Sequence, residues 1–189
     1  MAIEPVNFDT SGFYDAGLLK QVAVNLFYGW GYNFYRKENQ LRADDQLVRA
    51  KAAWLLGLAR SAVDVAEQAF RRERIPPPSR ANPYPDPKAV ADCQALERFG
   101  GAIGQVSGRL HAQPTPENDR ITQRYRSEMN SLQRLAASDE SLIGQCELLK
   151  SAVEGRDGAW VLEHLPSLEE GLRAIGRTLE QRQAVLLSY

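Results

Sequence analysis

A long stretch without proline, from Ala43 to Arg74, most strongly constrains how this chain can fold. Its apolar residues recur three, four or seven positions apart, the spacing that places side chains on one face of an α-helix. Asp44 or Asp45 is expected to cap this helix, unless the helix starts earlier, near Asn33. A helix of this length is stabilised mainly by packing its apolar face against other helices. We expect that buried face to contain Leu47, Trp54, Leu58, Ala62, Val65 and Ala69, with Leu55, Val63 and Phe70 beside them.

The remainder of the chain also has the composition of helices separated by loops. Ala and Leu together number 45, whereas Val, Ile and Thr together number 21. This ratio favours helix because branching at Cβ restricts side-chain rotamers against the preceding helical turn. No segment alternates apolar and polar residues as a half-buried strand does. We therefore predict an all-α fold, an antiparallel helical bundle of four to six helices with a proline-rich interhelical loop.

Six of the ten prolines lie within residues 75–87 and mark that loop. Proline cannot donate the backbone hydrogen bond that a helix interior needs, so the long helix should end before this segment. Asp86 followed by Pro87 is typical of an N-cap and a first helical residue. The next helix is therefore expected from Pro87 to about Ala112.

Helical spacing resumes in residues 118–154. Ser and Asp near the middle of this segment are good helix caps, so the sequence leaves open whether it forms one bent helix or two. The last helix is expected to follow Pro166, with Ser167 and Glu170 forming a capping box.

The length of 189 residues suits one domain, so we predict a single helical domain spanning residues 1–189. Within it, an N-terminal aromatic-rich helical segment, residues 1–38, would pack on a bundle formed by residues 39–189. Its helix should run from about Asp15 to the mid-30s, with a kink or early stop near Gly29.

Charge and cysteine usage narrow the functional classes. The net charge is −1, with 23 basic and 24 acidic residues, which argues against general nucleic-acid binding. No secretory signal and no apolar run long enough for a transmembrane segment is recognisable. Cys93 and Cys146 have no metal-binding spacing, so we expect buried thiols in a cytoplasmic protein.

Known catalytic and cofactor motifs are absent from the sequence. His111 and His164 are the only histidines, and neither belongs to a metal-binding motif, while no GxSxG motif occurs. Gly100, Gly104 and Gly108 recur every four residues but lack the GK[ST] ending of a phosphate-binding loop. We expect those glycines to let a neighbouring helix approach closely. The prediction is no cofactor, no metal site and no recognisable catalytic residue.

One region could form a ligand site. Aromatic residues are densest between Phe27 and Tyr35, and polar residues recur at helical spacing just beyond them. Arginine side chains there could hold an anionic ligand by bidentate contacts. The alternatives are that the aromatic residues fill the core or a dimer interface and that the polar residues form ordinary surface pairs. The candidate ligand-binding residues are Tyr32, Tyr35, Arg36, Arg42, Asp45 and Arg49.

These observations predict a non-catalytic helical-bundle interaction or scaffold protein. Its apolar helical surface exceeds what one antiparallel bundle needs, so we expect self-association as a homodimer or binding to a protein partner. The alternative is a small-ligand-binding or enzymatic bundle with a pocket near residues 32–49. A ligand site should show buried, paired Arg and Asp groups around a concave pocket, whereas an interaction module should expose an apolar patch.

Overall fold

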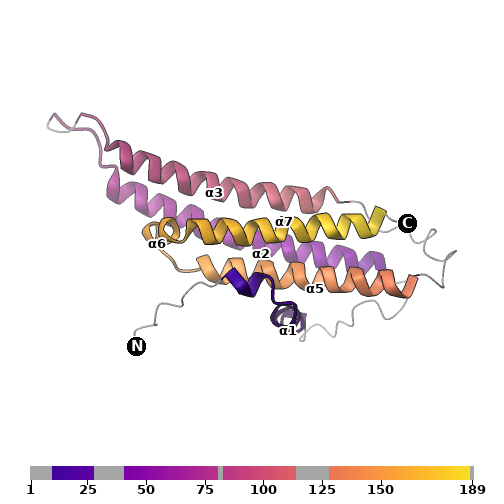
Figure 1. Ribbon diagram of the computed structural model, residues 1–189. Coiled ribbons are helices and arrows are strands. Elements are labelled where there is room, and N and C mark those ends of the chain that lie inside the picture. Colours follow the sequence, from indigo (N-terminus) through magenta and orange to yellow (C-terminus); the bar gives the residue numbers. More distant parts are fainter. Residues whose placement is uncertain (1–9, 28–40, 81–82, 114–127, 188–189) are drawn as a thin grey trace.

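The computed structural model describes residues 10–27, 41–80, 83–113 and 128–187, with side chains from Asp45 onward in the second range and from Arg134 onward in the last. These residues form α-helices joined by loops, with no strand among them, and confirm the predicted all-α bundle (Figure 1). The elements are η1 (Thr10–Phe13), α1 (Ala16–Phe27), α2 (Leu41–Arg74), α3 (Pro87–His111), α5 (Glu128–Val153), α6 (Gly158–Glu163) and α7 (Leu165–Leu187).

Four long helices, α2, α3, α5 and α7, form the bundle, and each runs antiparallel to the one before it in the chain (Figure 1). The contacting pairs α2–α5 and α3–α7 run parallel. Each helix contacts two of the others, in the cyclic order α2, α3, α7 and α5. As a result, α2 and α7 lie diagonally across the bundle from each other. The short α6 lies at one end, beside α2, and α1 crosses the bundle on the α5 side, where it is seen end-on in Figure 1.

The helix α2 matches its predicted bounds but buries a different face. Its buried apolar residues are Val48, Ala52, Leu55, Leu56, Ala59, Val63 and Ala66. Leu55 and Val63 were expected there, whereas the predicted main stripe through Leu47, Trp54 and Leu58 was wrong because those side chains are exposed. The helix carries two apolar stripes, and the bundle covers only one of them.

Two of the predicted helix boundaries are settled by hydrogen bonds. Asp86 caps α3 by accepting a hydrogen bond from the backbone N–H of Lys88, as expected. In contrast, α7 begins at Leu165 and includes Pro166, so Ser167 does not cap it. Glu170 instead contacts side chains that lie outside the first turn of α7, and these contacts are described below.

The remaining boundaries resolve the open alternatives. Within the described residues, α5 is continuous from Glu128 to Val153, so no second helix starts near residue 138. The short helix α6 was not predicted, and its N-cap, Asp157, accepts a hydrogen bond from the backbone N–H of Trp160. The predicted continuation of the first helix beyond Phe27 lies outside the described residues.

Glycines allow the N-terminal segment to lie directly on the bundle. A Cβ atom on Gly144 of α5 would lie 2.6 Å from the backbone oxygen of Leu19 in α1. A Cβ on Gly171 of α7 would lie 2.6 Å from Cζ of Phe13 in η1. Any larger residue at either position would therefore force the segment outward.

The predicted glycine stripe of α3 faces α2 at two of its three positions. A Cβ on Gly100 would lie 3.0 Å from the side chain of Asp64 and 3.8 Å from that of Val63, and one on Gly104 would lie 3.0 Å from the side chain of Arg60. A Cβ on Gly108 would meet nothing within 4 Å. The expected close approach of a neighbouring helix is therefore found at Gly100 and Gly104, where side chains of α2 are the nearest atoms, but not at Gly108.

The thiols of Cys93 and Cys146 are buried and unpaired, as expected from their positions on apolar stripes. Among the described helices, none combines the length and the apolar character that crossing a membrane requires.

Candidate functional site

The most prominent surface feature is an apolar stripe that α2 exposes along its length. We use the name α2 stripe for Leu47, Trp54, Leu58 and Val65, whose exposed fractions lie between 38% and 67%. Large apolar side chains that share one helix face and remain in contact with water are typical of interaction surfaces. The ammonium group of Lys51 lies 4.1 Å from the ring centroid of Trp54, so the indole also holds a cation.

A hollow of about 400 Å³ lies at one end of the α2 stripe, between α1 and α2. It is lined by Leu26, Phe27, Leu47, Ala50, Lys51 and Trp54. Only Lys51 among these residues is charged, so the hollow is suited to an apolar group rather than to an anion.

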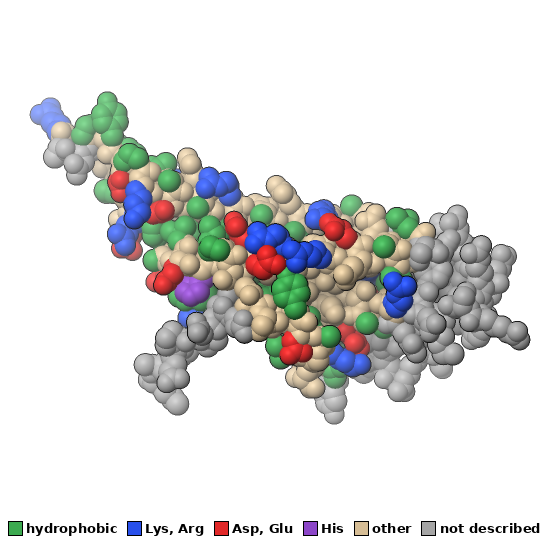
Figure 2. Space-filling model, viewed as in Figure 1, with side chains coloured by type: hydrophobic (Ala, Val, Ile, Leu, Met, Phe, Trp, Pro, Cys, Tyr) green, Lys and Arg blue, Asp and Glu red, His purple; other side chains and the backbone are tan. Residues whose placement is uncertain are grey.

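The charged surface formed by α3 and α7 differs from the apolar α2 stripe. On the face formed by α3 and α7, acidic and basic side chains alternate without a large patch of either sign (Figure 2). On α2, Arg71 pairs with Glu67 of the same helix and with Glu97 of α3. Exposed pairs of this kind contribute little to stability. They show that the charge of Arg71 is compensated by local partners.

A cluster of charged side chains is buried in the interior of the bundle around Arg182 of α7. Arg182 is 0% exposed. Its Nε donates to Oδ1 of Asp139 on α5 at 2.6 Å, and its Nη2 donates to Oδ1 of Asp45 on α2. The third donor, Nη1, reaches Oε1 of Gln113, just beyond α3, at 2.9 Å. One guanidinium thus joins the N-terminal end of α2, the segment just after α3, the middle of α5 and the C-terminal part of α7.

Arg49 and Gln113 complete this buried cluster. Arg49 donates to Oδ2 of Asp45 and, at 2.7 Å, to the backbone oxygen of Gln113. The Gln113 amide also donates to the backbone oxygen of Leu179 at 2.6 Å. The two arginines and the two aspartates balance in charge, so the cluster can be buried without an uncompensated ion.

The protonation state of Arg182 follows from its surroundings. Burial lowers the pKa of the guanidinium, but the attraction and hydrogen bonds of Asp139 and Asp45 outweigh burial and raise that pKa above its usual value. Arg182 is therefore permanently charged, and the cluster has no group on this side chain that could exchange a proton.

The structure describes the side chains of only two of the predicted ligand-binding residues. Asp45 is fully buried and Arg49 nearly so, in the cluster rather than along the surface. Neither residue lines the apolar hollow. Tyr32, Tyr35 and Arg36 lie outside the described residues, as does the side chain of Arg42, so a ligand role for this set stays a prediction.

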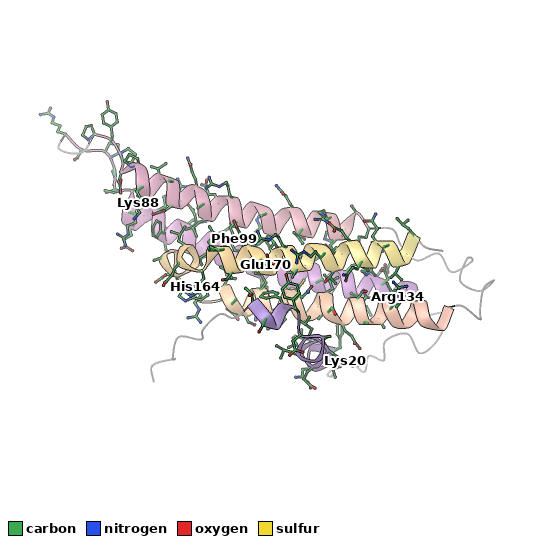
Figure 3. The ribbon with its side chains drawn as sticks, viewed as in Figure 1. Lys20, Lys88, Phe99, Arg134, His164 and Glu170 are labelled. Carbon is green, nitrogen blue, oxygen red and sulfur yellow. The ribbon has the colours of Figure 1, made fainter. Side chains whose placement is uncertain are left out.

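A second polar group of residues joins the N-terminal segment to α7. Tyr14 donates to Oε1 of Glu170, which projects from α7 in Figure 3, and Arg177 donates to the Tyr14 hydroxyl at 3.0 Å. Glu170 also accepts from Arg173 at 2.8 Å. The hydrogen bond from Tyr14, followed by that from Arg173, lowers the pKa of Glu170, while the hydrogen bond to Glu170 raises the pKa of Tyr14.

The contacts of His164 and the burial of the two cysteines indicate structural roles. His164 stacks on Trp160 with ring centroids 4.1 Å apart, and its Nδ1 lies 2.9 Å from the backbone oxygen of Trp160. Burial raises the pKa of both Cys93 and Cys146, which keeps these thiols protonated and poorly nucleophilic. The described residues contain no group of His, Cys, Asp or Glu arranged to hold a metal ion.

Sequence reasoning missed Arg182 and Asp139, although a signal was present. Arg182 follows Ile175 and Leu179 at helical spacing, and Asp139 lies at the same spacing between Leu135 and Leu142. A charged residue on an apolar stripe is placed in the core unless the helix turns it outward, so each needs a buried partner of opposite charge.

Comparison of the chain with models of known protein families, with curated proteins and with solved structures finds no match. The functional conclusion therefore depends on the geometry described above.

Proposed function

We propose that this chain is a non-catalytic helical interaction protein that binds a second copy of itself through the α2 stripe. The observation that supports this proposal is the exposure of four large apolar side chains along one face of the longest described helix. Leaving them in water is unfavourable, and burying them against a partner would release that cost.

The spacing of the stripe favours a second copy as the partner. Leu47, Trp54, Leu58 and Val65 are seven, four and seven positions apart, a pattern that reads the same in both directions. A twofold axis between antiparallel α2 helices would therefore place Leu47 beside Val65 of the partner subunit and Trp54 beside Leu58 of the partner subunit. Isologous contacts of this kind are the commonest in protein oligomers.

The residues around the stripe are compatible with close helix packing. Ala50, Gly57 and Ser61 are exposed on the same side of α2, and a Cβ on Gly57 would meet nothing within 4 Å. Small side chains there would let the partner helix approach the backbone. The stripe spans about 27 Å of helix at 1.5 Å per residue, enough for several turns of contact.

A cytoplasmic location is part of the proposal. Its support is that both cysteines remain free thiols, which is typical of proteins in a reducing compartment.

Light scattering on the purified chain tests the proposal. The expected mass is twice the chain mass of 21.1 kDa, falling to one chain mass in the Trp54→Glu, Leu58→Glu double variant. The matched controls are Tyr84→Glu and Leu187→Glu, which place the same charge on exposed apolar residues outside the stripe and should leave the dimer intact. A wild-type chain that stays monomeric at about 100 µM, well above the dissociation constants of stable homodimers, would refute the proposal.

The alternative of a small-ligand-binding bundle has one observation in its favour. The apolar hollow beside Trp54 has about the volume of a small-molecule site. The self-association proposal accounts for the same residues, because Leu47 and Trp54 belong to both features. We therefore treat the hollow as the end of the proposed interface.

A further inference from the structure

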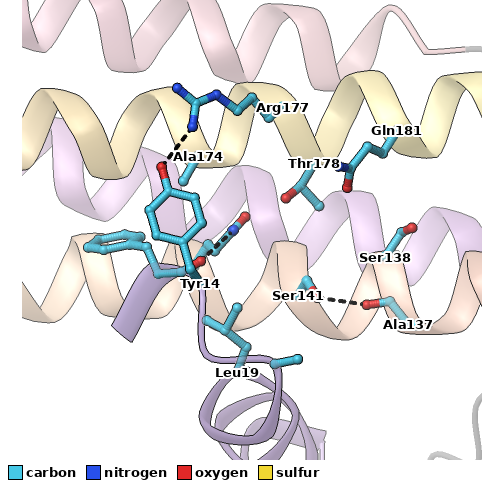
Figure 4. Close-up of a pocket in the computed structure, with 12 residues that line it drawn as sticks. Tyr14, Leu19, Ala137, Ser138, Ser141, Ala174, Arg177, Thr178 and Gln181 are labelled. Carbon is cyan, nitrogen blue, oxygen red and sulfur yellow. Dashed lines mark hydrogen bonds between the residues drawn. The ribbon is translucent and has the colours of Figure 1, made fainter. Parts of the chain in front are cut away.

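A separate pocket lies where the N-terminal segment meets α5 and α7 (Figure 4). Its volume is about 290 Å³, and we call it the junction pocket. Unlike the hollow beside Trp54, it is lined by polar groups from several elements. Those used below are Tyr14, Ser138, Ser141, Gln145, Arg177 and Thr178.

The α5 wall of the junction pocket presents hydrogen-bond acceptors. Ser138 and Ser141 each donate their hydroxyl hydrogen to a backbone oxygen one turn earlier, at 2.9 Å; the Ser141 bond to Ala137 is drawn in Figure 4. Because those hydrogens are already engaged, the hydroxyl oxygens face a ligand only as acceptors.

Gln145 extends this acceptor row by one turn. Its Nε2 donates to the backbone oxygen of Phe13 at 2.9 Å, which fixes the orientation of the amide. Its Oε1 accepts no hydrogen bond, although the residue is only 4% exposed. A buried amide oxygen without a partner is unfavourable, and a donor supplied by a ligand would satisfy it.

The α7 wall presents a cation. Arg177 lines the pocket and directs Nη1 to the Tyr14 hydroxyl at 3.0 Å (Figure 4). The same Nη1 lies 3.4 Å from Oε1 of Glu170. Both contacts use the same nitrogen, so among the described residues Nε and Nη2 of Arg177 have no hydrogen-bond partner. A guanidinium with two adjacent N–H groups available matches a carboxylate.

From these two walls we propose that the junction pocket binds a small organic acid that also carries hydroxyl or ammonium donors. The acid group would pair with Arg177, and the donors would reach Ser138, Ser141 and Gln145 on the opposite wall. Thr178, which lies beside Arg177 in the sequence and also lines the pocket, adds a hydroxyl that can serve either group.

The size of the pocket limits the ligand. A volume of about 290 Å³ lies at the lower end of ligand sites, which favours a compact metabolite over a nucleotide or a peptide. The pocket is independent of the α2 stripe, since none of its lining residues lies on α2. Ligand binding and self-association can therefore succeed or fail separately.

Isothermal titration with three probes tests the proposal. D-Gluconate supplies a carboxylate with hydroxyl donors, L-serine supplies one with an ammonium donor, and propionate supplies a carboxylate alone. We expect gluconate or serine to bind at least about tenfold more tightly than propionate, because only they engage both walls. The tighter binder of the two shows whether the pocket prefers hydroxyl or ammonium donors.

Two variants assign the binding to the pocket. Arg177→Gln should weaken the bound probe about tenfold or more by removing the cation. Arg173→Gln is the matched control: Arg173 lies one turn away on α7, is similarly exposed (55% against 57%) and also pairs with Glu170, but does not line the pocket. Ser141→Ala should weaken gluconate or serine and leave propionate unchanged.

Three results would overturn the proposal. One is the absence of heat with both gluconate and serine at about 10 mM, a concentration that detects even weak binding. Another is equal weakening by Arg177→Gln and Arg173→Gln, which indicates a general charge effect. The third is propionate binding as tightly as the other probes, which removes the role of the α5 oxygens. Unchanged circular dichroism of each variant establishes that the fold is intact.

Discussion

Arg182 and Asp139 meet in the interior of the bundle at 2.6 Å, and neither side chain is exposed to solvent. The two residues come from neighbouring helices, α7 and α5, and the same guanidinium continues across the bundle to Asp45 on α2. Burying ions costs free energy, which the mutual hydrogen bonds offset. The cluster therefore fixes how α2, α5 and α7 are placed along one another, in addition to any contribution to stability.

Replacing Arg182 by Met should strongly destabilise the protein. The change leaves Asp139 and Asp45 buried without their shared cation, which typically costs about 3–5 kcal/mol. The measurement is the free energy of unfolding from urea denaturation. Arg173→Met, an exposed arginine on the same helix, should change it by less than about 1 kcal/mol.

The same cluster supplies a rescue experiment. Combining Arg182→Met with Asp139→Asn removes the uncompensated charge, because Asp45 keeps Arg49 as its partner, so much of the lost stability should return. A double variant as unstable as Arg182→Met alone would show that packing, and not charge, determines the loss.

Glycine substitutions should separate close backbone contacts from open positions. Gly144→Ala is expected to destabilise by about 1–3 kcal/mol, because its Cβ would overlap the backbone of Leu19. Gly101→Ala, on an open helical surface, should stabilise by about 0.5–1 kcal/mol through helix propensity. Thermal unfolding of both variants checks the expectation, and equal melting temperatures would contradict the docking of α1 described here.

The contact between Tyr14 and Glu170 should make stability depend on pH. The pKa of Glu170 is lowered, so its contribution is complete above the usual glutamate pKa and is lost as the pH falls through the lowered value. The pKa of Tyr14 is raised, so its contribution is complete below the usual tyrosine pKa and is lost as the pH rises through the raised value.

The measurement for this contact is the melting temperature of wild type minus that of Tyr14→Phe across the pH range. We expect a difference that is largest between about pH 5 and pH 9 and shrinks at both extremes, as the reference pKa values of Glu and Tyr require. A difference independent of pH would mean that the hydroxyl contributes only through packing.

Much of the fold was predictable because helical spacing and proline placement are local signals. The bounds of α2 and α3, and the cap at Asp86, follow from residues that lie next to each other in the chain. Periodicity shows that α2 is amphipathic, but α2 has two apolar stripes. Which of them faces the core depends on the neighbouring helices, so the stripe containing Trp54 was assigned to the wrong side.

The interior cluster was also only partly predictable from local signals. The sequence identified Asp45 and Arg49 as a polar pair, since they lie one helical turn apart. Their principal partner, Arg182, is 137 positions from Asp45, and its contact arises only when α7 returns along the bundle. The junction pocket is likewise assembled from distant segments, and no local motif marks it.

The central claim is that two chains meet across the α2 stripe, and a Gly57→Cys variant tests it most directly. Position 57 lies next to the midpoint of the stripe, and a side chain there meets open space. Cys93 and Cys146 are buried, so the new thiol is the exposed one among the described cysteines.

Mild oxidation should produce a disulfide-linked species of twice 21.1 kDa, because a twofold axis brings the two copies of residue 57 close together. Gly101→Cys, equally open but on α3, should stay at one chain mass. A Gly57→Cys chain that does not cross-link, or that cross-links no more than Gly101→Cys, would contradict the account.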